Sequence, residues 1–177
     1  MNRKIAILRG INVGGRRKIL MADLKSLCEK LGWKNVTSYI QSGNLIFDSN
    51  QQNTELEHVL EMAIKEQFKF DVPVIVRSST ELKTAIAKNE FYSEDADINQ
   101  LHLTFLKEKP TAENIENTLN YNHKTDKLKI VDKDVFIVCS GKYHQSKLSN
   151  NFFEKKLNVG ATTRNWKTVL KLQELCE

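Results

Sequence analysis

The sequence has few of the residues that break a chain and few that cross-link it. Among 177 residues there are only 2 prolines, 7 glycines and 3 cysteines, while hydrophobic residues make up 40%. This composition is typical of a globular protein and argues against a disordered chain. The cysteines are Cys28, Cys139 and Cys176, and without a CxxC pair they indicate neither a disulfide framework nor a zinc ribbon.

Long apolar runs are also missing. The first residues, MNRK, lead into a short apolar strand that is interrupted at Arg9. This segment is too short and too polar for a signal peptide or a membrane span. We therefore expect a cytoplasmic protein with reduced thiols and no membrane partner.

Recognised patterns of a catalytic or metal site are absent as well. The histidines lack HExxH and paired-ligand spacing, so no metal and no cofactor are predicted. The closest approach to a nucleophilic pair is Cys139 with His144, or Ser146 beside Lys147. Cys139 alternates with apolar residues on one strand face, which is the usual setting of an inert buried cysteine. The catalytic residues, if any, are unknown. The four histidines are His58, His102, His123 and His144.

The charge, by contrast, is concentrated in particular segments. The net charge of +5 divides into +6 for residues 1–20, −5 for residues 21–139 and +4 for residues 140–177. Clustered positive charge attracts anions more strongly than its sum suggests. A phosphate, a carboxylate or a nucleic acid is therefore the expected kind of partner.

Hydrophobic periodicity in the first half predicts the order β-α-β-β-α-β, which is the ferredoxin-like or split βαβ plan. Pro73 lacks an amide hydrogen and places the last of these strands at an edge of the sheet. A helix that opens with a capping box at Ser78 and ends near Lys88 follows. The predicted strands cover residues 3–9, 36–41, 45–48 and 72–77, and the first two helices cover residues 21–31 and 54–68.

The second half begins the same plan again after a polar loop over residues 89–100. Its pattern predicts a strand, a helix and a β-hairpin, followed by two helices and no fourth strand. These elements cover residues 101–106, 110–119, 127–132, 135–139, 149–157 and 164–176. The predicted fold is therefore α+β with a duplicated ferredoxin-like plan, in two halves over residues 1–89 and 100–177 that form one compact unit.

Two polar loops of the first half are expected to meet. In a split βαβ sheet the first two strands run parallel, with the third inserted antiparallel between them. The hairpin turn then lies beside the end of the first strand, which brings RGINVGG (residues 9–15) next to QSGN (residues 41–44). We predict a ligand site at this rim. Its candidate residues are Arg9, Gly10, Asn12, Gly14, Gly15, Gln41, Ser42 and Asn44.

These residues also have structural interpretations. The amides of Gly14 and Gly15 could form an anion nest beside a run of basic side chains, or the glycines could simply make a turn. Gln41 and Asn44 each offer a donor and an acceptor to a ligand. For Asn44 the hairpin turn is the favoured explanation, because asparagine beside glycine tolerates the left-handed conformation, whereas Gln41 has no such explanation.

Three further candidates lie near the end of the chain. Lys147 belongs to the polar segment 140–147, which could form a ligand loop. Arg164 and Asn165 open the predicted last helix, where a threonine cap and an anion at the helix N-terminus are both possible interpretations.

The motifs ILRGINVGG, SYIQSGNLIF, VPVIVRS, SKLSNNFFEKKL and ATTRNWKTVLKLQEL resemble the bacterial family known as domain of unknown function 1697. The resemblance spans essentially the whole chain. It implies a small α+β protein without an established activity, substrate or cofactor. The recurrent polar positions of the family map onto the candidates named above, together with Gly43, Ser146 and Thr163.

Three functions remain open at this stage. The leading hypothesis is a binding module for an anionic or nucleotide-like ligand, including nucleic acid, at the rim. The second is an enzyme for a small phosphorylated or acyl substrate that Arg9, Asn12, Gln41 and Asn44 would polarise. The third is an interaction protein that docks through its last two helices and Trp166. The oligomeric state is unknown, although a monomer is favoured.

Overall fold

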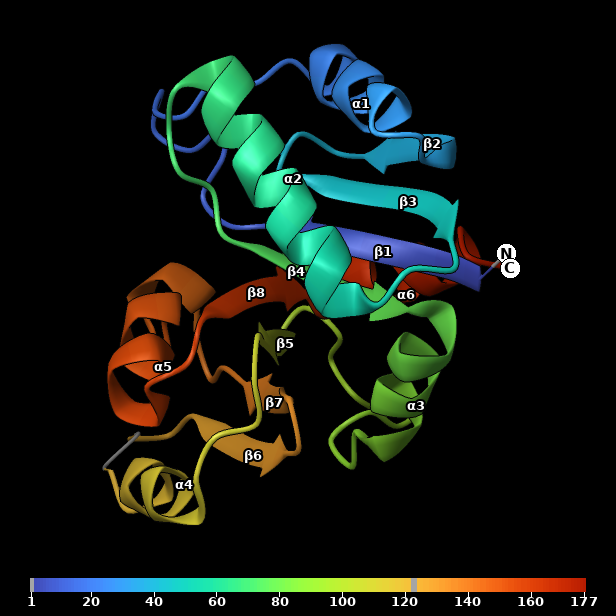
Figure 1. The fold of residues 1–177 in the computed structure, drawn as a ribbon. Helices are drawn as coiled ribbons and strands as arrows, with labels where there is room; N and C mark the ends of the chain where they lie inside the picture. Colours follow the sequence, from blue (N-terminus) through green and yellow to red (C-terminus); the bar gives the residue numbers. More distant parts are fainter. Residues whose placement is uncertain (1, 122–123) are drawn as a thin grey trace. The chain divides into compact units, whose positions relative to one another are not determined.

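The computed structural model describes residues 2–121 and 124–177 and divides into two compact units (Figure 1). The first unit comprises the residues up to Lys83 together with Leu172–Glu177, and the second comprises Thr84–Lys171. Each unit contains one four-stranded sheet.

The described residues form eight strands and six helices, with one short 3₁₀ turn over Tyr143–Gln145. The first seven elements are β1 (Asn2–Leu8), α1 (Met21–Lys30), β2 (Lys34–Tyr39), β3 (Asn44–Ser49), α2 (Asn53–Phe68), β4 (Val74–Ser78) and α3 (Ser79–Lys88). The remaining elements are β5 (Leu101–Leu106), α4 (Ala112–Leu119), β6 (Lys127–Val131), β7 (Asp134–Val138), α5 (Asn150–Leu157), β8 (Ala161–Asn165) and α6 (Trp166–Glu174).

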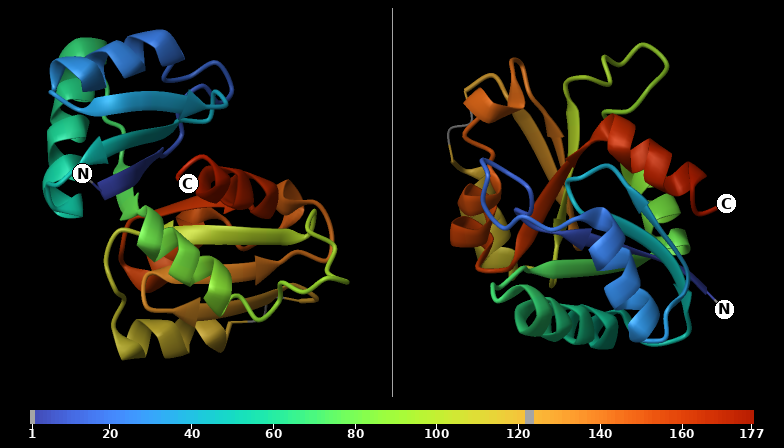
Figure 2. Two further views of the ribbon diagram at one scale, coloured as in Figure 1. Left: turned by 90° about the vertical axis from the view of Figure 1, so that its right-hand side faces the viewer. Right: turned by 90° about the horizontal axis from the view of Figure 1, so that it is seen from above.

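Both sheets have the same strand order. The first is ordered β2-β3-β1-β4 and the second β6-β7-β5-β8, and all neighbouring strands are antiparallel (Figure 2). β4 lies at an edge directly after Pro73, as the missing amide hydrogen of that proline predicts. The predicted order of the first-half elements is confirmed.

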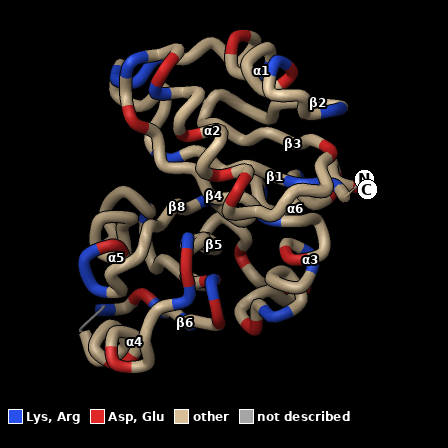
Figure 3. Tube along the Cα trace, in the orientation of Figure 1, with Lys and Arg blue, Asp and Glu red and all other residues tan. Residues whose placement is uncertain are grey.

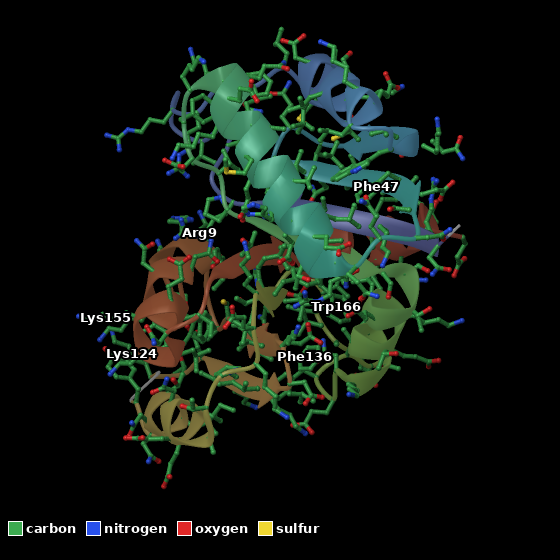
Figure 4. The ribbon with its side chains drawn as sticks, in the orientation of Figure 1. Arg9, Phe47, Lys124, Phe136, Lys155 and Trp166 are labelled. Carbon is green, nitrogen blue, oxygen red and sulfur yellow. The ribbon has the colours of Figure 1, made fainter. Side chains whose placement is uncertain are left out.

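The core of the first unit lies between one face of its sheet and the helices α1 and α2. Leu24 and Leu27 of α1 and Leu60 of α2 are buried in it with apolar residues of all four strands. Trp33 stacks on Phe47 of β3, with ring centroids 3.9 Å apart and an interplanar angle of 14°. Figure 4 labels Phe47 on β3. Such stacking adds to the burial of the two rings.

The second unit has a smaller core on the equivalent face of its sheet. Phe153 and Leu157 of α5 pack with Val135 and Ile137 of β7. Helix α4 lies beside α5 and contributes the partly buried Ile115. The same arrangement of helix on sheet therefore occurs in both units.

The strand β8 corrects the prediction that the second half ends in two helices. Residues 161–165, with the sequence ATTRN, pair with β5 from Leu106↔Ala161 to His102↔Asn165. Only the two threonines of this segment favour a strand, so the local sequence gives a weak signal. Pairing with the buried strand β5 decides the conformation, and helix α6 begins only at Trp166.

The last strand of each unit lies at an edge of its sheet, and glutamates of a neighbouring helix accept hydrogen bonds from its amides. Val74 N–H donates to Glu61 Oε1 (2.8 Å) and Val76 N–H donates to Glu57 Oε1 (2.9 Å), both from α2. These bonds occupy amides that an edge strand would otherwise leave unpaired. In the second unit the same position is taken by Glu154 Oε1 of α5, which accepts from the Ala161 amide.

The capping boxes were predicted with mixed accuracy. Ser78 N–H donates to Glu81 Oε2 (2.7 Å) and Glu81 N–H donates to Ser78 Oγ (3.1 Å), which confirms the box that opens α3. The sequence TELE over residues 54–57 also predicts a capping box of Thr54 and Glu57 for α2, but the helix begins earlier, at Asn53, and Glu55 accepts from the amide of Gln52 instead. Glu57 instead accepts a hydrogen bond from the amide of Val76 in β4.

Each half has the same pair of backbone hydrogen bonds at the end of its first strand. In each half, the last strand amide and the next amide donate to carbonyls just before the third and fourth strands. The four bonds are Leu8 N–H to Gly43 O (2.8 Å), Arg9 N–H to Pro73 O (2.9 Å), Leu106 N–H to Lys133 O (2.8 Å) and Lys107 N–H to Gly160 O (2.8 Å).

Candidate functional site

The segment between β1 and α1 folds into a small hairpin of its own. Arg16 N–H donates to Val13 O (3.1 Å) and Asn12 N–H donates to Arg17 O (3.2 Å). Gly14 and Gly15 occupy the two central positions with φ of +58° and +74°. Positive φ at both positions is what a type I′ turn requires. Turn geometry therefore accounts for both glycines, and an anion-binding role for their amides stays a prediction.

Asn12 ties this hairpin to the second polar loop. Its side-chain amide donates to Ile19 O and to Gln41 O, both at 2.9 Å, and its Oδ1 accepts from Ile19 N–H at 2.9 Å. The first contact closes the base of the loop, and the second crosses to the β2–β3 turn. The predicted convergence of the two loops is confirmed, and Asn12 is the residue that holds them together.

Gly43 makes a second contact between the loops. Its φ is +85°, and a Cβ atom placed there would lie 2.8 Å from both Ile11 Cδ1 and Leu8 Cβ. Side-chain atoms do not approach that closely, so a larger residue would push the β2–β3 turn away from the end of β1. Ile11 is fully buried under this contact.

The turn itself holds an unusual backbone conformation. Ile40 has a φ of +50° and a side chain that is 48% exposed. A β-branched residue in this region is rare and costs on the order of 1–3 kcal/mol. The buried side chain of Asn44 stabilises the turn by donating to Tyr39 O (3.1 Å) and to Ser42 Oγ (3.2 Å). These bonds fit the structural interpretation of Asn44.

A cavity of about 470 Å³ opens between the two loops and the beginning of α1. This volume lies within the range of small-molecule sites in proteins. Its wall combines polar and apolar residues, from the loops as well as from the helices. The lining residues are Asn12, Gly15, Lys18, Ile19, Leu20, Met21, Asp23, Gln41 and Phe68. We call this the rim cavity.

The charges around the rim cavity are mainly positive. Lys18 is its cation and Asp23, in the first turn of α1, is its carboxylate. The loop that bears Lys18 carries further arginines, and Figure 3 shows a group of basic positions in blue at the upper left of the view. Leu20 precedes α1 without a side-chain cap, so the first amides of that helix add partial positive charge at the cavity wall.

The structure separates the first-half candidates into two groups. Asn12, Gly15 and Gln41 line the rim cavity, and Gln41 is exposed. Arg9 and Gly10 lie at the base of the loop, where Arg17 Nη1 donates to the carbonyl of Arg9 (3.5 Å). Figure 4 labels Arg9. The second group supports the loop rather than lining the cavity.

Sequence reasoning missed much of the apolar wall. Phe68 comes from the end of α2, far along the chain, and no sequence pattern links it to the rim. Leu20 is 71% exposed although it lies between a buried isoleucine and a helix. An apolar residue directly before the helix that begins at Met21 is the sequence signal for this part of the wall.

The candidates near the end of the chain lie in other places. Arg164 is buried in β8, its Nη1 donates to Thr163 O (3.0 Å), and burial lowers its pKa to about 10, which leaves it charged at neutral pH. Asn165 Oδ1 accepts from Thr168 N–H (2.8 Å) and is the cap of α6, so the predicted threonine cap is corrected. Lys147 follows the 3₁₀ turn of the second unit.

The chemistry of the other reactive groups is limited. Cys139 is fully buried, and burial followed by the charge of Asp126 raises its pKa to about 11, so its thiol stays protonated at neutral pH. Within residues 2–121 and 124–177, no three His, Cys, Asp or Glu side chains gather as metal ligands. His123 lies outside the described residues. No described helix has the length and apolarity needed to cross a membrane.

Comparison with known proteins places the chain in a family. The model of the family described as "Protein of unknown function (DUF1697)" matches residues 1–136. The chain belongs to this family. The matched region contains the rim and the whole first sheet.

One solved structure is similar to this DUF1697 protein over nearly its whole length. The conserved bacterial protein SP0830 from Streptococcus pneumoniae is 25% identical in sequence, with a TM-score of 0.81 over 99% of each chain. Both units of the present chain are therefore represented in it. Among curated proteins, none matches the chain.

Proposed function

We propose that this DUF1697 protein is a binding module for a small anionic, nucleotide-like ligand held in the rim cavity. The observation that carries the proposal is a cavity of about 470 Å³ between two loops that Asn12 fastens together. A site whose walls are fixed before binding loses less entropy when the ligand arrives. The structure thus supplies a preformed pocket rather than a flexible surface.

The lining suggests what the ligand carries. Lys18 would pair with a phosphate or carboxylate, and Gln41 would both donate to and accept from a polar ring or amide. Met21 and Phe68 offer an apolar surface for the remainder of the ligand. A nucleoside monophosphate combines these features, and Asp23 at the edge of the cavity would favour a ligand that also has a hydrogen-bond donor.

An enzyme at the same rim has weaker support. Among the described residues that line the cavity, Lys18 and Asp23 are the ionisable ones, and none of those residues forms a pair of nucleophile and base. Acid-base or covalent catalysis needs such groups within hydrogen-bond reach of the substrate. Binding is therefore the better account of this set of residues.

A second candidate function rests on exposed apolar side chains. Val13, Leu20 and Ile40 are 63%, 71% and 48% exposed, and all three belong to the two rim loops. Exposed apolar groups gathered within a basic surface favour a partner protein that covers the rim. A pull-down followed by light scattering separates the candidates, because a partner protein that covers the rim adds its mass to the complex whereas a small ligand does not.

We further propose that the chain arose by duplication of one ferredoxin-like plan, with halves at residues 1–89 and 100–177. The identical strand orders and the four matched backbone bonds support this proposal. We also propose a cytoplasmic location, which the free cysteines support, and a monomeric state.

The main proposal is tested by titrating ¹⁵N-labelled protein with adenosine monophosphate and following its amide resonances by NMR. We expect the amides of Gly15 and Gln41 to shift and saturate. Lys18→Gln should weaken the binding about tenfold, because a charge-assisted hydrogen bond to phosphate is lost. The matched control is Lys30→Gln, which removes an exposed charge at the other end of α1 and should bind as the wild type does.

Two results would count against the proposal. Unchanged rim amides at millimolar ligand would exclude a nucleotide at this site. A nucleic-acid ligand predicts an affinity that falls steeply with salt, so a single-stranded oligonucleotide whose affinity does not change with salt would exclude that version.

A further inference from the structure

The second unit has a cavity of its own that shares no lining residue with the rim cavity. It measures about 210 Å³ and lies where the segment after β7 faces the residues before β6. Six of its lining residues carry the argument: Lys124, Asp126, Ser140, Lys142, Ser146 and Lys147. We call it the lysine cavity.

Asp126 fixes the floor of the lysine cavity. Its Oδ1 accepts from the amide (2.9 Å) and hydroxyl (3.0 Å) of Ser140, and its Oδ2 accepts from the hydroxyl of Ser146 (2.6 Å). Leu148 N–H donates to Ser146 Oγ (3.0 Å), which directs the serine proton toward the carboxylate. The negative charge of Asp126 is therefore held by three donors inside the loop.

A ring contact holds the middle of the same loop. Tyr143, in the 3₁₀ turn, stacks on His102 of β5 with centroids 4.6 Å apart and an interplanar angle of 21°. The amides of Gln145 and Ser146 donate back to the loop at Lys142 O (2.9 Å) and Tyr143 O (3.0 Å). The loop is thus fixed in shape from Ser140 to the buried Leu148.

The lysines of this cavity extend from that fixed frame. Lys124, Lys142 and Lys147 line it and are exposed, so the lining carries three lysines and a single carboxylate. Lys147 Nζ lies 5.8 Å from the centroid of the Tyr121 ring, and Lys156 Nζ lies 5.1 Å from the same ring. Gathering like charges in one place costs electrostatic free energy, which an anion between them would offset.

We propose that the lysine cavity binds one phosphoryl group of a phosphorylated small molecule. Three cations and one carboxylate leave two positive charges in excess, which matches a phosphate dianion. The volume of about 210 Å³ is smaller than that of ordinary small-molecule sites, which begin near about 300 Å³, so only a terminal group enters it. This site lies outside the rim and does not depend on the function proposed there.

The experiment titrates inorganic phosphate into ¹⁵N-labelled full-length protein at constant ionic strength, with chloride as the reference anion. We expect the amides of Gly141 and Lys147 to shift and saturate at millimolar phosphate, while chloride leaves them in place. Lys142→Gln and Lys147→Gln should each weaken this binding about fivefold or more. The matched control is Lys167→Gln, an exposed lysine of α6, which should leave the affinity unchanged.

Three outcomes would overturn the proposal. The first is the absence of any shift at Gly141 with phosphate in the wild type. The second is an affinity that Lys142→Gln and Lys147→Gln do not change although both variants unfold at the wild-type urea midpoint. The third is a shift by a single-stranded oligonucleotide but not by phosphate, because this would indicate a polyanion surface rather than a phosphoryl site.

Discussion

The two halves of this protein repeat one order of strands and helices, but they lengthen different connections. In the first half, β1 and α1 are joined by residues 9–20, whereas β5 and α4 are joined by residues 107–111. The relation is reversed one step later, since β3 and α2 are joined by residues 50–52 and β7 and α5 by residues 139–149. Each half has one long loop, and each long loop lines a cavity.

This difference shows which part of the fold is scaffold and which part is specialised. The matched bonds at Leu8, Arg9, Leu106 and Lys107 keep the ends of the first strands alike. Because β1 and β3 are antiparallel, the connection that follows β1 and the connection that follows β3 begin at opposite ends of the sheet. Connections on the surface can change without disturbing the sheets, and such loops commonly carry function.

The largest expected effect comes from Gly43→Ala. The new Cβ would lie 2.8 Å from atoms of Leu8 and Ile11, and the φ of +85° is unfavourable for alanine. We expect the free energy of unfolding to fall by about 2–4 kcal/mol. The equivalent carbonyl of the second half belongs to Lys133, where Lys133→Ala should cost less than about 1 kcal/mol. Urea unfolding of both variants measures the contrast, and equal losses would contradict the special role of the rim contact.

Asn12→Ala should have the next largest effect. It removes the bond donated to Gln41 O, which joins the two loops, and the two bonds with Ile19, which close the base of the first loop. We expect a loss of about 1–3 kcal/mol in the free energy of unfolding. Asn12→Asp keeps the acceptor for the Ile19 amide but places a carboxylate oxygen against the carbonyls of Ile19 and Gln41, so it should not recover that loss. The NMR resonance of the Gln41 amide should shift in both variants. An unshifted resonance would show that the two loops meet without Asn12.

The caps of α3 and α6 should respond differently to pH. Burial would raise the pKa of Glu81, but hydrogen bonds from the Ser78 amide and the Asn53 side chain outweigh it and lower that pKa below its usual value of 4.5. The contribution of Glu81 is therefore present above about pH 4.5 and is lost as the pH falls through the lowered folded-state value. Asn165, which caps α6, does not titrate.

Glu81→Gln should accordingly destabilise the protein by about 1 kcal/mol at pH 7 and by much less near pH 3. Asn165→Ala should cost a similar amount at both pH values. The free energy of unfolding, measured by urea at each pH, gives the two differences. A loss for Glu81→Gln that is the same at pH 3 as at pH 7 would contradict the lowered pKa.

The smallest effect concerns the hairpin turns. Ile40 of the first half has a φ of +50°, and Asp132 of the second half has a φ of +53°. Asparagine and aspartate tolerate this region better than isoleucine does. Ile40→Asn should therefore raise the free energy of unfolding by about 0.5–1 kcal/mol, and Asp132→Asn, the control, should not raise it. A lower thermal midpoint for Ile40→Asn would show that the isoleucine side chain stabilises the turn by contacts that outweigh the strain.

The sequence contained enough to predict the sheets of the first half and the meeting of its loops. The predicted helix over residues 21–31 covers α1 (Met21–Lys30), and the predicted strand over residues 45–48 lies within β3 (Asn44–Ser49). The convergence at Asn12 and Gln41 followed from strand order alone. These features depend on local periodicity and on one topological rule.

The features that were missed depend on contacts between distant segments. β8 forms because ATTRN pairs with a buried strand, although its own residues resemble a helix cap. Phe68 reaches the rim cavity only because α2 packs against the sheet beside α1. Lys124 and Lys147 share a cavity because Asp126 draws the loop after β7 toward β6. The segments in each of these contacts lie far apart in the chain, so no short stretch of sequence predicts that they meet.

The most direct test of the account is a crystal structure of the protein grown with adenosine monophosphate. The account predicts density in the rim cavity, with the phosphate near Lys18 and the base between Gln41 and Phe68. A rim cavity that stays empty at millimolar nucleotide, or a nucleotide bound elsewhere on the first unit, would contradict the claim that the long β1–α1 loop exists to hold a ligand.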